Sequence, residues 1–184
     1  LLATILSQNV SSENTTRAVE NLDEAYHTYK EIEDAPLEEL AEVIRPDGLP
    51  ETKANRLQNA LEHIREETGG EYTLAFLDEM PTEEAKAWLE EINGVGPKTA
   101  SVVLNFHFDA PTFAVDTHIH RIAQRYGFVP EGTSPERTQE LLDPAIPDDL
   151  KYELHNLLIQ HGREYCTAQN PDYDNPVSRR YWAD

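Results

Sequence analysis

The chain of 184 residues has a single cysteine, few basic side chains and no long apolar run. One cysteine excludes a disulfide within the chain. No apolar stretch approaches the roughly 18 residues that a membrane-spanning helix needs, so the sequence predicts no membrane association and a cytoplasmic location. An apolar content of 39% is ordinary for a globular protein. The length fits one large domain or two small ones and is enough to bury a real core.

Basic residues are scarce, because 15 Lys and Arg stand against 35 Asp and Glu and give a formal net charge of −20. Such a charge opposes DNA binding, which depends on Lys and Arg neutralising phosphates. The acids are unevenly distributed, however, since Asp109 and Asp116 are the only ones between residues 97 and 130. An acidic protein with a neutral-to-basic face fits a very salty cytoplasm, where repulsion is screened over a few ångströms. We interpret the chain as halophilic; the competing interpretation is a protein that avoids DNA.

The apolar pattern is helical throughout, without a convincing alternating strand, and the loops are short, so the predicted fold is all-α. Helices are expected over 12–29, after Pro36, over 51–67, over 74–80, from a cap at Thr82, over 97–106, over 117–126, from a cap at Ser134, and from Asp148 onward.

Residues 92–100, with the sequence Ile-Asn-Gly-Val-Gly-Pro-Lys-Thr-Ala, indicate the end of one helix, a two-glycine turn and a second helix that starts at Pro97. Proline suits the first helical position because its φ is preset. Gly94 and Gly96 permit positive φ and a close backbone approach. A turn that feeds a helix N-terminus offers unpaired N–H groups to a phosphate. The segment therefore predicts a phosphate-binding turn, or, as the simpler alternative, a plain connector.

Lys98 breaks a local rule, because a cation is disfavoured in the first turn of a helix. The same position favours the neutral amine that a nucleophile needs. Asp116 is expected to cap the helix that starts at Thr117 and to stay ionised, because its carboxylate would accept backbone N–H bonds. Taken singly, Lys98 is a surface residue and Asp116 a structural cap; taken together, they predict a catalytic pair.

The hairpin segment and Val-Asp-Thr-His at 115–118 resemble the helix-hairpin-helix (HhH-GPD) DNA glycosylases, specifically their endonuclease III branch. Residues 2–9 resemble the family's early helix, which ends near DNA, and residues 47–54 resemble its minor-groove loop. The resemblance implies a six-helix bundle with the hairpin over 1–110, and a C-terminal helical lobe over 111–184, on either side of a DNA-binding cleft. In similar enzymes a helix upstream of Leu1 also belongs to the second lobe, so we expect that lobe to be incomplete here.

The implied activity is that of a bifunctional DNA glycosylase and AP lyase of base excision repair. Lys98 would attack C1′ of the damaged nucleotide, release the base, form a Schiff base and cleave the strand by β-elimination. Asp116 would orient the lysine, accept its proton or stabilise the sugar cation. The expected substrate is an oxidised pyrimidine, with 8-oxoguanine or mismatched thymine as the runner-up. The alternative from another class is a non-catalytic DNA-binding module in which Lys98 is only a basic contact.

The resemblance also implies the partner and its contacts. The partner would be double-stranded DNA with damaged bases or abasic sites, bound by a monomer at the nucleoid of a prokaryote, here a haloarchaeon. Leu49 would wedge into the base stack, and Gln8 or Asn9 would fill the gap left by the flipped base. The simpler alternatives are a loop leucine on a local core and an ordinary helix-end amide. The expected phosphate contacts are Gly94, Val95, Gly96, Thr99 and His118.

The end of the chain departs from the family pattern. Endonuclease III enzymes usually hold a 4Fe–4S cluster on four cysteines spaced Cys-x6-Cys-x2-Cys-x5-Cys. Counted from Cys166, the later positions fall on Tyr173, Pro176 and Trp182. One thiolate does not hold a cluster that needs four, so no cofactor is predicted and the second lobe is a remnant of an iron–sulfur domain. Either aromatic side chains pack there instead, or the segment was altered. A family-type monovalent cation at the hairpin carbonyls stays open, and His118 with His120 lacks a third metal ligand.

Overall fold

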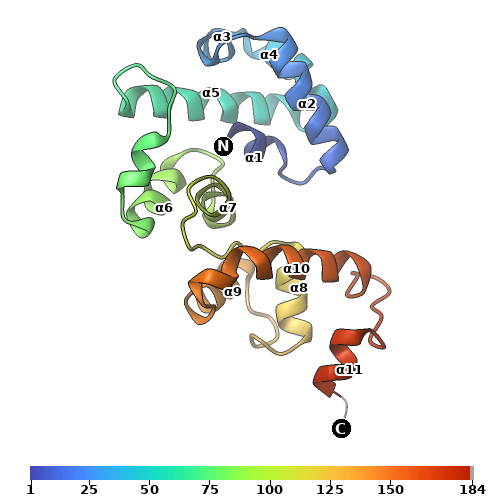
Figure 1. Ribbon diagram of the computed structural model, residues 1–184. Coiled ribbons are helices and arrows are strands. Elements are labelled where there is room, and N and C mark those ends of the chain that lie inside the picture. The colour runs from blue at the N-terminus through green and yellow to red at the C-terminus, as the bar shows by residue number, and fades with distance from the viewer. Residues whose placement is uncertain (183–184) are drawn as a thin grey trace. The chain divides into compact units, whose positions relative to one another are not determined.

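The structure, a computed structural model, describes residues 1–182, without the side chains of Asp47 and of residues 180–182. Every regular element in that range is a helix, which confirms the all-α prediction (Figure 1). The chain divides into two compact units, Leu1–Val103 and Leu104–Asp184. The division falls within α7 (Pro97–His107), and residue 110, where the sequence places the boundary, lies in the loop after that helix. No helix of the described part has the length and hydropathy of a membrane span.

The first unit is organised around its longest helix, α5. Its helices are α1 (Leu2–Leu6), α2 (Ser12–Ala25), α3 (Tyr29–Asp34), α4 (Leu37–Val43), α5 (Pro50–Glu67), α6 (Thr82–Glu91) and the start of α7. Helices α1, α3 and α4 pack on α5 (Figure 1). One face of α5 is buried at helical spacing, through Ala54, Leu57, Ala60, Leu61 and Ile64. This apolar stripe holds the unit together.

The prediction of a single helix over 12–29 is wrong, because one helix ends at Ala25 and a second helix begins at Tyr29. The Thr28 hydroxyl accepts a hydrogen bond from Glu31 N (3.2 Å), and the Glu31 carboxylate accepts one from Thr28 N (3.3 Å). This capping box satisfies two backbone donors at a new helix start. The local cap therefore outweighs the continuous helical periodicity.

A polar clasp joins α3 to α5. The Glu33 carboxylate accepts hydrogen bonds from Arg65 Nε (2.9 Å) and from the Tyr72 hydroxyl. Burial of the phenol and the neighbouring Glu33 carboxylate raise the pKa of Tyr72 to about 12. The clasp stabilises the far end of α5.

The second unit is built on α8 and α10. After the end of α7 its helices are α8 (Thr117–Arg125), α9 (Pro135–Leu142), α10 (Lys151–Glu164) and α11 (Pro176–Trp182). Helix α8 packs against both α9 and α10 (Figure 1). The core of the second unit is formed by Phe113, Val115 and Ile119, with Leu142, Ile146, Leu154 and Leu158 packed against them.

Two predicted helix caps have different outcomes. The Ser134 hydroxyl accepts a hydrogen bond from Arg137 N (3.2 Å) and caps α9, as predicted. Thr82, in contrast, is the first residue of α6, and the cap position belongs to Pro81, which forms no side-chain cap bond. Proline fixes the extended backbone before the helix without a cap bond.

The start of α10 also differs from the prediction, because Asp148 opens a 3-10 turn and the α-helix begins at Lys151. Lys151 is buried, with Nζ 2.9 Å from Asp143 and 3.0 Å from Asp148, and it donates to the Pro111 carbonyl (2.6 Å). Burial opposes the charge, but the two aspartates outweigh it and leave the pKa of Lys151 raised. Asp143 also accepts a hydrogen bond from Phe113 N (3.0 Å), so this cluster fixes the segment that leads to Asp116.

Candidate active site

The hairpin turn lies between Glu91, the last residue of α6, and Pro97, the first of α7. Gly94 has φ +88°, in the left-handed region that glycine tolerates. A Cβ at this position would lie 2.4 Å from Cδ of Arg56, so the packing of the turn also depends on the absence of a side chain at Gly94. Gly96 lies outside the left-handed region and faces open space, so only Gly94 uses the freedom expected of both glycines.

Lys98 is the second residue of α7, and its side chain is exposed. The first backbone bond of this helix runs from Ala100 N to the Gly96 carbonyl (3.0 Å). The N–H groups of Lys98 and Thr99 therefore have no acceptor within the helix, which is the arrangement that binds phosphate. Within residues 1–103 the structure describes no hydrogen bond or ion pair that engages the Lys98 amine. The amine is thus available for chemistry.

Gln8 is drawn into the hairpin, whereas its neighbour is not. Its Nε2 donates to the Gly94 carbonyl (2.9 Å) and to Thr99 Oγ1 (3.2 Å), and its Oε1 accepts from Arg56 Nη1 (2.8 Å). Asn9 is exposed and has φ +59°, a conformation that asparagine tolerates better than most residues. Of the two candidate gap-filling amides, Asn9 is the one left exposed.

Leu49 stands in a strained and exposed position. It has φ +50° and ψ +47°, directly before the first residue of α5, and the residue is 68% exposed. A left-handed leucine costs roughly 1–2 kcal/mol. The alternative of a leucine packed on a local core is wrong, since the side chain buries little. A strained apolar residue held in solvent points to a contact that the free protein lacks.

Asp116 caps α8 as predicted, because its Oδ1 accepts a hydrogen bond from Ile119 N (2.8 Å). The buried segment before it is held by side chains of later helices. Val115 N donates to Gln139 Oε1 (3.0 Å), and His155 Nδ1 lies 3.0 Å from the Ala114 carbonyl. These bonds fix the backbone from which the carboxylate projects. Asp116 belongs to the second unit and Lys98 to the first.

His118 is tied to its own unit. Its Nδ1 lies 2.9 Å from Arg121 Nη2, and a Cβ at Gly162 would lie 2.8 Å from His118 Cβ. His120 Nε2 lies 2.8 Å from the Thr133 carbonyl. Among the described residues, no group of three or more His, Cys, Asp or Glu is placed to hold a metal ion.

Two arginines of α8 organise the segment around Cys166, whose side chain is buried. Arg121 Nε donates to the Cys166 carbonyl (2.7 Å), and Arg125 Nη1 lies 3.4 Å from Cys166 Sγ. Arg125 also donates to the carbonyls of Thr167 (2.6 Å) and Ala168 (3.0 Å). Guanidinium groups therefore satisfy backbone carbonyls of the loop in which the family resemblance places the cluster ligands.

Of the remaining cluster positions, Tyr173 is 58% exposed and Pro176 starts α11. The Trp182 side chain lies outside the described residues. Buried Asn175 caps α11 instead, because its Oδ1 accepts from Ser178 N (2.9 Å). The sequence analysis missed this helix, although Asn followed by Pro is a helix-start signal.

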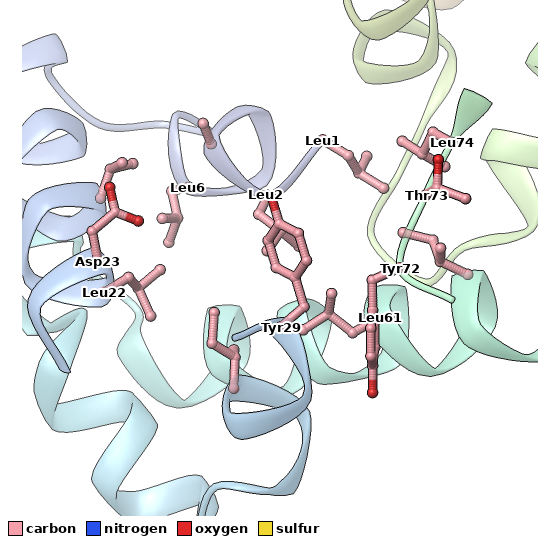
Figure 2. Close-up of a pocket in the computed structure, with 14 residues that line it drawn as sticks. Leu1, Leu2, Leu6, Leu22, Asp23, Tyr29, Leu61, Tyr72, Thr73 and Leu74 are labelled. Atoms are coloured by element: carbon pink, nitrogen blue, oxygen red, sulfur yellow. The ribbon is translucent and has the colours of Figure 1, made fainter. Parts of the chain in front are cut away.

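The first unit also contains a pocket of about 440 Å³ beside α1. Figure 2 shows leucine side chains around it, with Asp23, Tyr29 and Tyr72 as its larger polar neighbours. Its lining includes none of the residues predicted to touch DNA. The pocket is therefore separate from the hairpin and from Leu49.

Comparison with known proteins agrees with this geometry. Residues 2–147 match the HhH-GPD superfamily of base excision DNA repair proteins. Endonuclease III of Thermotoga maritima is 36% identical over 171 residues, which cover 93% of this chain and 75% of the relative. The chain belongs to the endonuclease III branch of this superfamily. Endonuclease III of Escherichia coli is 34% identical, with 93% of this chain and 76% of the relative covered.

A solved structure supports the same membership. A trapped covalent intermediate of an endonuclease III with DNA has a TM-score of 0.83 and 31% identity, covering 96% of this chain and 78% of that chain. The all-helical architecture described above matches the fold of the endonuclease III branch.

The polar core around His161 provides a pH-dependent element of the second unit. The Tyr126 hydroxyl lies 2.7 Å from His161 Nε2 and 2.9 Å from Ser178 Oγ. His161 is buried, and burial lowers its pKa below the ordinary value. The unfolded chain therefore binds a proton at a pH where the folded chain still resists it.

We expect the free energy of unfolding to fall as the pH drops below about 6.5, because protonation of His161 favours the unfolded state. Thermal unfolding of wild type and His161→Asn between about pH 7 and pH 5 measures this, and the variant should lose less stability over that range. His27→Asn, at an exposed histidine, is the control and should follow wild type. Equal pH dependence in wild type and His161→Asn would contradict the assignment.

Proposed function

We propose that this DNA glycosylase and AP lyase of base excision repair removes oxidised pyrimidines and cleaves the strand at the resulting abasic site. The activity class follows from membership of the endonuclease III branch. The observation that supports lyase chemistry in this chain is the exposed Lys98 at the N-terminus of α7, beside the turn at Gly94. Its substrate is damaged double-stranded DNA.

In the proposed reaction, Lys98 Nζ forms a bond to C1′ while the bond from C1′ to the base breaks, and the base leaves with the electron pair. The sugar ring opens as the C1′–O4′ electron pair moves to O4′, which takes a proton, and the Schiff base results. Loss of a C2′ proton then forms the C2′–C3′ double bond, and the 3′ phosphate leaves with the electron pair of the C3′–O bond. The exposed position of Lys98 in the first turn of α7 leaves its amine accessible to a bound nucleotide. The free N–H groups of the same helix bind the adjacent phosphate.

We propose that Asp116 acts on the same nucleotide. Its Oδ1 is occupied by Ile119 N, which fixes the carboxylate on the helix start. The carboxylate orients the lysine, accepts its proton or stabilises the developing sugar cation. A module that only binds DNA has no use for a carboxylate facing phosphates, so Asp116 favours the enzyme over the binding module.

The proposed DNA contacts combine exposed side chains with the backbone of the hairpin. Leu49 wedges into the base stack and Asn9 fills the vacated space, while Gln8 supports the hairpin from behind. His118 contacts a phosphate through Nε2, since its Nδ1 faces the Arg121 donor. The hairpin contacts are the backbone of Gly94, Val95 and Gly96 and the N-terminal turn at Thr99.

Lys98→Gln should abolish both strand cleavage and the crosslink that borohydride forms with abasic DNA, because an amide does not form an imine. Affinity for abasic DNA should remain within about tenfold, since the backbone N–H groups supply the phosphate grip. Gel electrophoresis after borohydride treatment measures the crosslink. Lys30→Gln, at an exposed lysine of α3, is the matched control and should trap like wild type.

Asp116→Asn should keep α8 capped, because an asparagine oxygen also accepts from Ile119 N, and should slow base release by about 10²-fold. Duplexes with an oxidised pyrimidine, 8-oxoguanine or a mismatched thymine identify the substrate, and fastest release of the oxidised pyrimidine is expected. Trapping by Lys98→Gln would place the nucleophile elsewhere. A wild type that traps on no abasic duplex would favour the binding module.

We propose that the second unit is a remnant of the family's iron–sulfur lobe and holds no cluster, because Cys166 is the only cysteine of the chain. The residues do not fit a group that needs four thiolates. The purified protein should be colourless and free of iron, whereas absorbance near about 400 nm with stoichiometric iron would contradict this. At the hairpin, the Gly94 carbonyl already accepts from Gln8, so a monovalent cation would have to share it.

We also propose a halophilic, haloarchaeal origin, supported by the net charge of −20. Unfolding temperature should rise with KCl as self-repulsion is screened, and a neutral osmolyte is the control because it screens no charge. With few phosphate contacts, the log–log slope of DNA affinity against salt should be shallow, about −2 to −4. Greatest stability at low ionic strength would contradict the proposal.

A further inference from the structure

One side-chain amide connects both sides of the hairpin turn. Gln8 Nε2 donates to the Gly94 carbonyl before the turn and to Thr99 Oγ1 after it. Lys98 lies between these two anchor points in the chain. A contact that spans the turn restricts the angle at which α7 starts, and this angle sets the direction of the Lys98 side chain.

Arg56 fixes the orientation of that amide. Its Nη1 donates to Gln8 Oε1 at 2.8 Å, so the Gln8 oxygen faces α5 and the Gln8 nitrogen faces the hairpin. A hydrogen bond from a charged donor is stronger than a neutral one. The stem of Arg56 also covers Gly94, where a Cβ would lie 2.4 Å from Arg56 Cδ. Arg56 therefore supports the turn by packing and by a bond.

The same helix holds the end of α1 one turn earlier. Lys53 is buried, and its Nζ donates to the Leu6 carbonyl at 2.5 Å. Helix α5 begins directly after Leu49. The first turns of α5 thus connect the segments that carry Leu49, Asn9 and the hairpin.

We infer that Gln8 and Arg56 form a positioning relay that holds Lys98 in its reactive direction. The inference rests on the proposed nucleophile. Neither residue is assigned to the DNA or to the reacting atoms; Arg56 acts on Gln8, and Gln8 acts on the hairpin. Loss of either residue lowers the rate of imine formation more than it lowers affinity.

The test is a double-mutant cycle read by borohydride trapping on an abasic duplex at saturating protein. Gln8→Ala and Arg56→Ala should each slow trapping by about tenfold, and the double variant by about tenfold rather than a hundredfold, because both remove one relay. DNA affinity should change by less than about threefold. Gln8→Glu keeps the acceptor for Arg56 but loses the donor to Gly94, so it should be as slow as Gln8→Ala.

Arg65→Ala is the matched control. It removes an arginine of the same helix from the Glu33 clasp, so it should lower the unfolding temperature and leave the trapping rate unchanged. If the two effects multiply, so that the double variant traps about a hundredfold more slowly than wild type, the relay is overturned. A Gln8→Glu variant that traps at the wild-type rate would also overturn the relay. So would an Arg56→Ala variant that is less stable than wild type but traps at the normal rate.

Hydrogen exchange over residues 92–99 separates this inference from the proposed function. If wild type does not trap, the proposed nucleophile fails, and the relay is judged by exchange alone. Faster exchange of the hairpin in both single variants, with no further increase in the double variant, supports the relay. Wild-type exchange in either single variant would overturn it.

Discussion

The absence of a side chain at Gly94 is the constraint on which the hairpin and its contacts with Arg56 and Gln8 depend. The backbone there adopts φ +88°, and the stem of Arg56 occupies the space that a Cβ would need. Because the turn is bare, Arg56 reaches Gln8, and Gln8 reaches both sides of the hairpin. The direction of α7 and the exposure of Lys98 follow from this packing. A side chain at 94 would have to displace the Arg56 stem.

The second unit holds its carboxylate by a similar principle. The segment before Asp116 forms no helix or strand, and its backbone groups are satisfied by the side chains of Gln139, His155 and Asp143. Buried backbone polar groups need such partners. Both proposed catalytic groups therefore stand at helix starts.

Local signals in the sequence predicted most of the fold. The caps at Asp116 and Ser134 and the Gly94 turn depend on neighbouring residues, so the sequence displays them directly. The break at Thr28 and the cap at Asn175 also have local sequence signals. The prediction missed the first because the helical periodicity continues across it, and the second because the segment was compared only with the family's cysteine pattern. The contacts of Gln8 with the hairpin join residues far apart in the chain and leave no periodic pattern. The sequence indicated Gln8 or Asn9 for the DNA gap, and only the folded geometry shows the contact of Gln8 with the turn.

Lysine chemistry at the hairpin requires a covalent bond between Lys98 and the DNA sugar, and the position of that bond can be measured. Borohydride-trapped protein, digested with trypsin and nuclease, is examined by mass spectrometry for a peptide that carries the reduced sugar. We expect one adduct, on the peptide that contains Lys98, with tryptic cleavage blocked at that residue. An adduct on another lysine or on the N-terminal amine, with Lys98 unmodified, would contradict it.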